Sequence, residues 1–184
     1  MSLVPESPEA VLEFWFREVR ESAWWEKNPA FDLLLQRRFG ELHAAARQGE
    51  LWSWRRNIHG RLAEVIVLDQ FSRNLFRDSA AAFSCDAMAL ALAQEAVSSG
   101  NAGDLPPRQR SFLYMPFMHS ESAAMHREAL RLFSESGLEF NLDFEKRHKA
   151  IIDRFGRYPH RNAVLGREST PEETEFLQTP GSSF

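Results

Sequence analysis

The sequence predicts an all-α fold of about eight helices, and three observations indicate it. Apolar residues recur three and four positions apart along most of the chain, which places them on one face of a helix. Capping residues and glycines stand where these segments begin and end. No segment alternates apolar and polar residues for long enough to form a strand. We therefore expect antiparallel helical hairpins in one domain, residues 1–184, with a coil tail at residues 179–184.

The first two helices each begin with a capping side chain followed by proline. Ser7 precedes Pro8 and Asn28 precedes Pro29, and proline suits the first helical turn because its missing N–H is not needed there. Gly49 marks the end of the second helix. The residues of the second helix that we expect to face inward are Phe31, Leu34, Leu35, Phe39 and Leu42.

A third helix starts near Asn57 and carries an acid, Asp69, at the end of its apolar face. The residues that precede this acid at helical spacing are Leu62, Val65 and Ile66. A buried carboxylate is costly unless it is paired, and Arg73 follows one helical turn later. We therefore expect Asp69 to be buried and paired with an arginine or a histidine. Residues 71–83 are expected to be irregular or short-helical.

The later helices are predicted from caps and from one internal proline. Ser84, Ser120 and Asn141 are the expected caps of the fourth, sixth and seventh helices. Pro116 is expected to kink or end the fifth helix. Residues 170–173 read Thr-Pro-Glu-Glu, a capping box that opens the eighth helix. The glycines expected to end the fourth, sixth and seventh helices are Gly100, Gly137 and Gly156.

Composition bounds the class of protein. The net charge of −4 gives no general attraction to nucleic acid or to an anionic membrane. The single cysteine, Cys85, excludes a disulfide within the chain and indicates a reducing compartment. The opening residues 1–10 lack the basic and apolar regions of a secretory signal, and no window of about 18 apolar residues occurs. We expect a cytoplasmic protein with neither a nucleic-acid nor a membrane partner.

The most unusual stretch of the acidic chain is basic. Residues 146–167 hold seven lysines and arginines and one acid, an excess of six positive charges. Within it, residues 156–162 form a loop after a helix end, and the fork-shaped guanidiniums of Arg157 and Arg161 suit a carboxylate or a phosphate. The alternative is that these arginines bind the protein's own acids, with Asp69 and Glu121 as the obvious partners.

Four blocks carry a resemblance to a known family: LDQFSRNLFR (68–77), MPFMHSE (115–121), RFGRYPHRNAVLGREST (154–170) and PGSSF (180–184). Together with VLEFWF at residues 11–16, they make the chain resemble the mainly bacterial family called domain of unknown function 924. The resemblance implies a tetratricopeptide-like all-α superhelix with no assigned biochemical role. The chain departs from the family pattern at His126, where a glutamine is expected. The positions that match the family motifs are Asp69, Gln70, Arg73, Asn74, His119, Glu121, His160, Arg161 and Asn162.

These residues define a candidate polar site. We expect Asp69, Gln70 and His148 to be structural, because Asp69 and His148 lie on apolar helix faces. Four histidines and one acid invite a metal interpretation: His119, His126, His148, His160 and Glu121. No pair of them has a recognised ligand spacing such as H-E-x-x-H, so we expect neither metal nor cofactor. The candidate ligand-binding residues are Arg73, Asn74, His119, Glu121, Arg157, His160, Arg161 and Asn162.

Three functions remain open at this stage. The first is a binding module whose polar pocket takes a small anion or an acidic peptide end. The second is an enzyme in which His119 or His160 is the general acid or base, Glu121 or Asp69 orients it, and Arg161 clamps an anionic substrate. The third is a protein-interaction scaffold with a purely structural polar cluster. A closed pocket would favour the first two, and an exposed apolar groove would favour the third.

Overall fold

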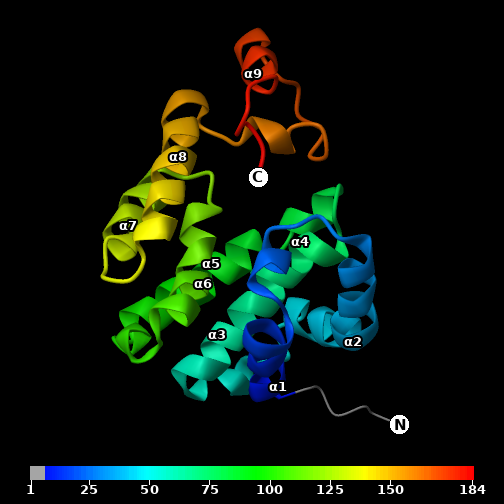
Figure 1. Ribbon diagram of the computed structural model, residues 1–184, viewed down its shortest axis with the longest axis vertical. Coiled ribbons are helices and arrows are strands. Elements are labelled where there is room, and N and C mark those ends of the chain that lie inside the picture. The colour runs from blue at the N-terminus through cyan, green and yellow to red at the C-terminus, as the bar shows by residue number, and fades with distance from the viewer. Residues whose placement is uncertain (1–6) are drawn as a thin grey trace.

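The computed structural model describes residues 7–184, and every regular element in that range is helical (Figure 1). A π-helical turn, Val67–Phe71, joins α3 to α4 without a break, so the described residues form eight α-helical rods, as predicted. The prediction that no secretory signal is present rests partly on residues 1–6, which lie outside the described residues. The α-helices are α1 Pro8–Glu13, α2 Pro29–Arg47, α3 Ile58–Ile66, α4 Ser72–Leu75, α5 Asp86–Ser98, α6 Pro107–Met118, α7 Ala123–Phe133, α8 Glu139–Phe155 and α9 Pro171–Phe176.

Several predicted helix ends are confirmed at the level of individual atoms. The side chains of Ser7, Asn28 and Asn57 accept hydrogen bonds from backbone N–H groups in the first turns of α1, α2 and α3. Thr170 and Glu173 form the reciprocal capping box of α9. Gly156 ends α8 with φ 69°, a left-handed conformation that glycine adopts without a steric penalty.

Three predicted caps are wrong, each because a neighbouring residue takes the position. The hydroxyl of Ser84 donates to the Ala81 carbonyl in the preceding turn, and α5 begins one residue later than expected. Ser120 accepts from the N–H of Ser122, which is itself the residue before α7. Asn141 lies inside α8, because this helix begins two residues earlier, at Glu139.

Two further expectations need correction. Pro116 does not end the fifth helix, since α6 continues to Met118 and buries this proline. Leu34 does not face inward, because 49% of its surface is exposed on α2. Residues 71–83 are short-helical, one of the two expected alternatives, since the helix that begins with α3 runs on to Leu75 and a 3-10 turn, Ala80–Phe83, follows.

The core divides into a large part and a small one. The large core lies beneath α1 to α7, and aromatic rings dominate its centre; fully buried examples are Phe14, Trp15, Phe39, Phe71 and Phe112. Helix α5 packs on α6, α6 on α7 and α7 on α8. A second small cluster of Ile151, Ile152 and Tyr158, with Phe155 and Phe176 against it, joins α8 to the following segment.

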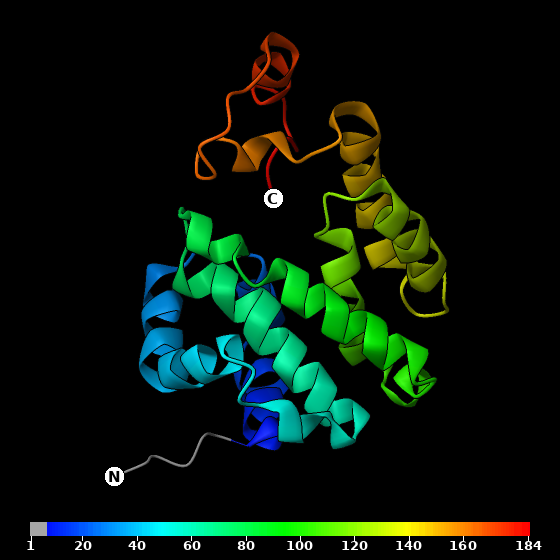
Figure 2. The same cartoon turned by 180° about the vertical axis from the view of Figure 1, so that it is seen from behind.

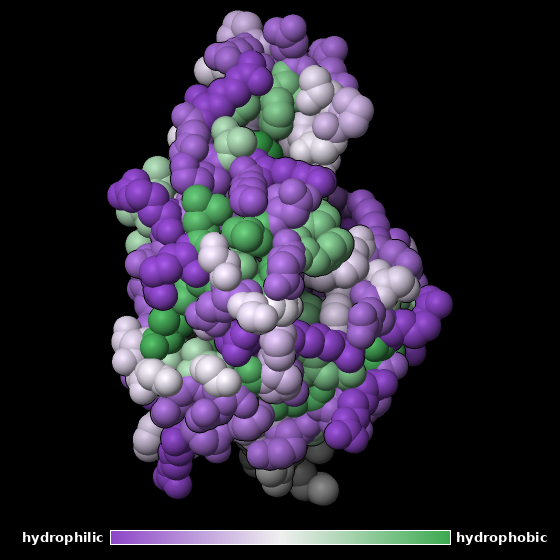
Figure 3. Space-filling view, turned by 60° about the vertical axis from the view of Figure 1, so that its left-hand side comes forward, coloured by the Kyte–Doolittle hydropathy of each residue, from purple (hydrophilic) through white to green (hydrophobic). Residues whose placement is uncertain are grey.

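Residues 157–184 form what we call the C-terminal lobe. Figures 1 and 2 show this lobe beyond the end of α8, with the chain end turned back toward the helical body. Figure 3 shows it as a narrower mass on the wider body, with a largely hydrophilic surface broken by apolar patches. Four predicted site residues, Arg157, His160, Arg161 and Asn162, lie at the start of this lobe, at its junction with the body.

One helical run among the described residues, Ala80–Ser98, is long and apolar enough to cross a membrane by length and composition. A single such run is weak evidence for a span, because core helices of soluble proteins meet the same criteria. Its carboxylate at Asp86 pairs with Arg73 at 2.9 Å and with Arg161 at 3.2 Å, contacts that tie the run to the protein interior.

Candidate functional site

Asp69 is the buried acid at the centre of the candidate site, as the sequence predicts. Only 1% of it is exposed. Its carboxylate lies 3.0 Å from Nη1 of Arg73 and 2.7 Å from Nδ1 of His119, and accepts a hydrogen bond from Gln70 at 2.7 Å. Burial alone would raise the pKa of Asp69, but the positive charge of Arg73 and the two other donors lower it. The prediction of a buried, paired Asp69 is confirmed.

His119 is oriented by this acid. Because the ionised carboxylate of Asp69 can only accept, Nδ1 of His119 carries the proton and donates it. Burial and the nearby guanidinium of Arg73 lower the pKa of His119, so the ring is neutral and Nε2 presents a lone pair. No described residue hydrogen-bonds to that Nε2, and 14% of the side chain is exposed.

Arg161 lies beside His119 with its guanidinium between two rings. Its Cζ is 4.4 Å from the ring centre of Phe83 and 4.8 Å from that of Tyr158. Nη1 donates to Asp86 at 3.2 Å and Nη2 to the carbonyl of His119 at 2.9 Å. The Nε–H of Arg161 is buried and finds no acceptor within the described part of the chain.

Two further histidines lie close to this group around Tyr158. The Nδ1–H of His148 donates to the Phe144 carbonyl at 2.8 Å, and burial lowers the pKa of His148 to about 3. Burial and Arg161 lower the pKa of His160 to about 4, and its Nδ1 is buried without a described partner. We name Asp69, His119, His148, His160 and Arg161 the open side of the site, because it retains unpaired donors and acceptors.

Three more predicted residues, Glu121, Arg157 and Asn162, belong to a closed side, in which polar groups are paired. Arg167 grips Glu121 with two hydrogen bonds of 2.7 and 2.9 Å, and Glu121 also accepts the backbone N–H of Tyr158 at 2.7 Å. Arg157 holds Glu173 in the same bidentate manner, at 2.7 and 2.8 Å. The residues of the closed side are Glu121, Arg157, Asn162, Arg167 and Glu173.

Asn162 connects the pairs of the closed side. Its amide donates to Glu173 at 3.2 Å and to Ser169 at 3.0 Å, and its carbonyl accepts from Arg167 at 3.0 Å. Arg157 lowers the pKa of Glu173 to about 2. These contacts fasten the C-terminal lobe to itself and, through Glu121, to the body.

Three further predicted residues pair with groups of the helical body. Asn74 donates to Asp32 of α2 at 2.9 Å, away from the other site residues. Gln70 donates to Asp69 and also approaches the sulfur of Met115 at 3.3 Å. Arg73 is shared between Asp69 and Asp86 and is therefore internally neutralised.

Other chemistry can be tested against the same geometry. No group of three or more His, Cys, Asp or Glu side chains in residues 7–184 is placed to hold a metal ion. Ser72 lies 2.7 Å from Nε2 of His43, but its hydroxyl donates to the Leu68 carbonyl and has no exposed surface, so it is not an accessible nucleophile.

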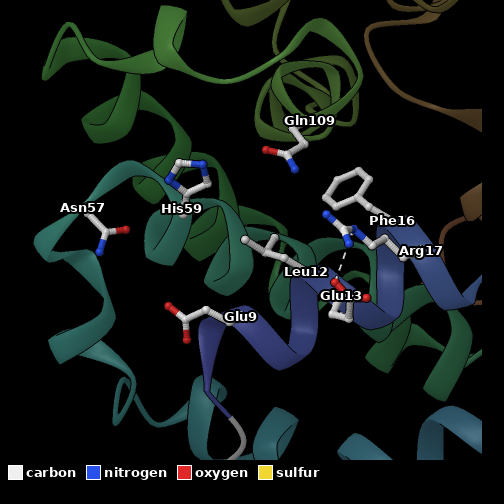
Figure 4. Close-up of a pocket in the computed structure, with 8 residues that line it drawn as sticks. All are labelled: Glu9, Leu12, Glu13, Phe16, Arg17, Asn57, His59 and Gln109. Atoms are coloured by element: carbon white, nitrogen blue, oxygen red, sulfur yellow. Dashed lines mark ion pairs between the residues drawn. The ribbon is translucent and has the colours of Figure 1, made fainter.

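Two surface depressions lie away from the candidate site. One, of about 330 Å³, is drawn in Figure 4, where Arg17 pairs with Glu13 at its edge and Gln109 faces it from α6. The other, of about 470 Å³, is lined mainly by aromatic residues and prolines; the exposed rings among them are Trp25 and Phe140. Neither depression is lined by a predicted site residue.

Comparison with known proteins identifies the family. The family model described as "Bacterial protein of unknown function (DUF924)" matches residues 11–181. The chain belongs to this family. A protein of unknown function from Agrobacterium tumefaciens, ATU0120, has a similar solved structure, with a TM-score of 0.88 and 36% sequence identity over 93% of this chain and 96% of that one. No curated protein matches.

Within this DUF924 chain, sequence reasoning missed three partners that decide the site's electrostatics: Asp86, Arg167 and Glu173. Arg167 was counted in the basic stretch and Glu173 in the capping box, but neither spacing names its partner. His126, at the position of the departure, is fully buried with its Nδ1 2.7 Å from Glu145, so it is part of the α7–α8 packing.

Proposed function

We propose that the open side binds a small anionic ligand, and that the closed side is its structural support. The observation that carries this proposal is the buried Nε–H of Arg161, which has no acceptor among the described residues. An unsatisfied buried donor costs about 1–3 kcal/mol, so such a group usually has a water, an ion or a ligand as partner. The unpaired Nδ1 of the adjacent His160 supports a site at the same place.

The proposal rests on local donors rather than on surplus charge. Glu173 neutralises Arg157 and Glu121 neutralises Arg167, while Asp86 is shared by Arg161 and Arg73. The protein's own acids therefore neutralise most of the excess positive charge found in the sequence. We expect modest anion affinity and a preference for ligands that reach both the Nε–H of Arg161 and the unpaired Nδ1 of His160.

An acid–base enzyme is the second candidate, and a separate observation favours it. Asp69 fixes the tautomer of His119 and leaves Nε2 free to accept a proton. A His119→Gln variant keeps a hydrogen-bonding side chain but cannot act as a base. An isotope-exchange assay on a bound carboxylate ligand tests this candidate. Exchange at α-carbon hydrogens that is lost in His119→Gln while binding persists would support it, and exchange equal in both proteins would remove it.

The third candidate, an interaction scaffold, is supported by the aromatic depression. Trp25 and Phe140 are 58% and 65% exposed there, which is unusual for large apolar side chains. The sequential packing of α5 to α8 is compatible with the tetratricopeptide-like superhelix that we propose for the arrangement. We also propose a cytoplasmic location in a bacterium, on the composition of the chain and the description of its family.

The anion proposal is tested with a matched pair of substitutions. Arg161→Lys keeps the charge that faces Asp86 but removes the Nε–H and the planar fork. Arg157→Lys makes the same change on the closed side. Thermal midpoints are measured with increasing inorganic phosphate or sulfate at constant ionic strength.

We expect the midpoint of the wild type and of Arg157→Lys to rise as stabilisation by a bound ligand requires, by RT ln(1 + [L]/Kd). The midpoint of Arg161→Lys should not respond. Equal responses of all three proteins would show that the anion binds elsewhere or only nonspecifically, and the proposal would be wrong.

A further inference from the structure

The last six residues of the chain form an ordered tail that returns to the candidate site. Gly181 has φ +78°, a conformation that lets the chain reverse. Ser182 is only 6% exposed, and its hydroxyl donates to the Leu177 carbonyl at 3.1 Å. Thr179 donates in the same way to Phe176 at 2.7 Å. The tail is therefore anchored before its final two residues, and the anchor directs Phe184 toward the junction of lobe and body.

The ring of Phe184 lies against three other rings of the site. Its centre is 3.8 Å from that of His148, 4.5 Å from that of His160 and 5.2 Å from that of Tyr158. No described residue makes a hydrogen bond to Ser183 or Phe184, and 53% of Phe184 remains exposed. The terminal residue is thus held by ring contacts alone, on a surface that it covers only partly.

The surface formed by the rings of His148, His160 and Tyr158, which we call the ring seat, is suited to an uncharged aromatic ring. The lowered pKa values of His148 and His160 keep both imidazoles neutral near pH 7. Tyr158 is held rigidly, since its hydroxyl donates to the Met118 carbonyl at 2.6 Å and the residue is fully buried. Cζ of Arg161 also lies 4.8 Å from the ring centre of Tyr158, so Tyr158 contacts both the ring of Phe184 and the guanidinium of Arg161.

We propose that Phe184 is a displaceable plug of the site, and that the external ligand is an aromatic carboxylate, with a ring for the seat of Phe184 and oxygen atoms for Arg161 and His160. The inference rests on the proposed anion-binding function and specifies its ligand. Binding then requires the plug to leave, and the apparent affinity falls by the fraction of molecules in which the seat is free.

The experiment compares two probes that differ in the ring. Phenylacetate carries a ring and a carboxylate, and acetate carries the carboxylate alone. Both are titrated by calorimetry at constant ionic strength into the wild type, Phe184→Ala and Phe140→Ala. Phe140 is the matched control, because it is an exposed phenylalanine on α8 that lines the aromatic depression instead.

We expect Phe184→Ala to bind phenylacetate on the order of tenfold more tightly than the wild type does, with acetate affinity unchanged. Phe140→Ala should match the wild type with both probes. In the wild type, saturating phenylacetate should shift the ring-proton NMR signals of His148 and His160, because the ring current of Phe184 is replaced. Phe184 contributes little buried surface, so its variant is expected to fold.

The remaining outcomes separate the two proposals. If acetate and phenylacetate bind and Phe184→Ala changes neither affinity, or weakens phenylacetate binding, the plug is wrong while anion binding stands. If neither probe binds to any of the folded proteins, the proposed function fails, and the ligand class fails with it.

Discussion

The open and closed sides of the site are built from the same short stretch of chain, yet they end in opposite states. Arg161 and Asn162 are neighbours in sequence and both are at most 5% exposed. Asn162 makes three side-chain hydrogen bonds, to Ser169, Glu173 and Arg167. Arg161 leaves its Nε–H unpaired. Asn162 is therefore paired within the lobe, whereas Arg161 keeps one buried donor without an acceptor among the described residues.

Burial therefore does not by itself distinguish support from function in this molecule. On the closed side, bidentate ion pairs hold residues in fixed relative positions that would otherwise move independently. The side chains of the open side are comparably buried, but some of their polar atoms have no partner. Such unpaired buried atoms destabilise a fold, so each of them calls for an explanation. Four experiments distinguish the two sides by the size of the effect that each is expected to have.

The largest effect is expected from removing the acid at the centre of the open side. Asp69→Ala leaves the buried guanidinium of Arg73 and the Nδ1–H of His119 without their shared acceptor. Loss of one partner from a buried pair costs about 3–5 kcal/mol of unfolding free energy. Urea denaturation at pH 7 measures it, with Asp143→Ala, an exposed acid of α8, as the control. A loss below about 1 kcal/mol would show that the remaining acid, Asp86, can satisfy Arg73 alone.

The second prediction is that the two sides lose their contributions to stability in different pH ranges. Burial lowers the pKa values of His148 and His160 below the unfolded value of about 6.5, so the unfolded chain binds protons that the folded protein does not. Stability contributed by these residues is present above pH 6.5 and is lost as pH falls toward 4 and 3. The loss between pH 7 and 5 is about 2 kcal/mol for His148.

The closed side should respond in a lower window. The pKa of Glu173 is lowered from 4.5 to about 2, so its contribution is present above pH 4.5 and is lost only as pH falls further. His43, which is buried outside both sides with a pKa near 4, adds to the upper window and stays constant in a variant comparison. Urea denaturation of His148→Gln between pH 7 and 5 should show a flatter dependence than the wild type. An unchanged slope would mean that His148 is not buried as a neutral ring.

Whether an interaction can be predicted from the sequence depends on how far apart its two partners lie along the chain. Caps followed by proline, at Asn28 and Thr170, are correctly predicted because both partners lie within one helical turn. Ser120 fails because Ser122 stands two residues away with the same chemistry. Periodicity likewise cannot decide which of the adjacent leucines at positions 34 and 35 faces inward, and only Leu35 does.

The site is predicted in composition but not in pairing. Asp69 could be predicted as buried because its helix phase and its neighbour Arg73 are local. The acids that neutralise Arg161 and Arg157 are 75 and 16 residues distant in sequence, and only the tertiary structure brings them near. Sequence reasoning therefore assigned both arginines to ligand binding, whereas their pairing differs.

A third, smaller effect is expected from loosening the closed side. Glu121→Gln keeps the shape of the side chain but removes the charge that Arg167 grips and weakens acceptance from the N–H of Tyr158. We expect a loss of about 1–2 kcal/mol. Amide hydrogen exchange should rise in residues 157–167 and remain unchanged in α3. Faster exchange across the whole chain would contradict a local fastening role.

The smallest effect, zero, is expected from removing metal ions, and it bears on the nature of the open side. His148 and His160 pack against Tyr158, and His119 belongs to the same open side, a grouping that invites a metal interpretation. In two of these histidines Nδ1 already makes a hydrogen bond: His119 donates to Asp69, and His148 donates to a backbone carbonyl. Only Nε2 atoms remain for coordination there, and no group of three ligands in the described residues is placed for it.

Dialysis against a strong chelator should therefore leave the thermal midpoint unchanged, within about 1 °C, since a structural metal would contribute to folding and its loss would be conspicuous. The same dialysed protein should keep its phosphate response, because that response depends on Arg161 and not on a cation. Stoichiometric zinc or iron in the purified protein, lost together with stability, would contradict this expectation. In that case the unpaired Nδ1 of His160 and the free Nε2 of His119 would be metal ligands, and the open side would be a metal centre instead of an anion site.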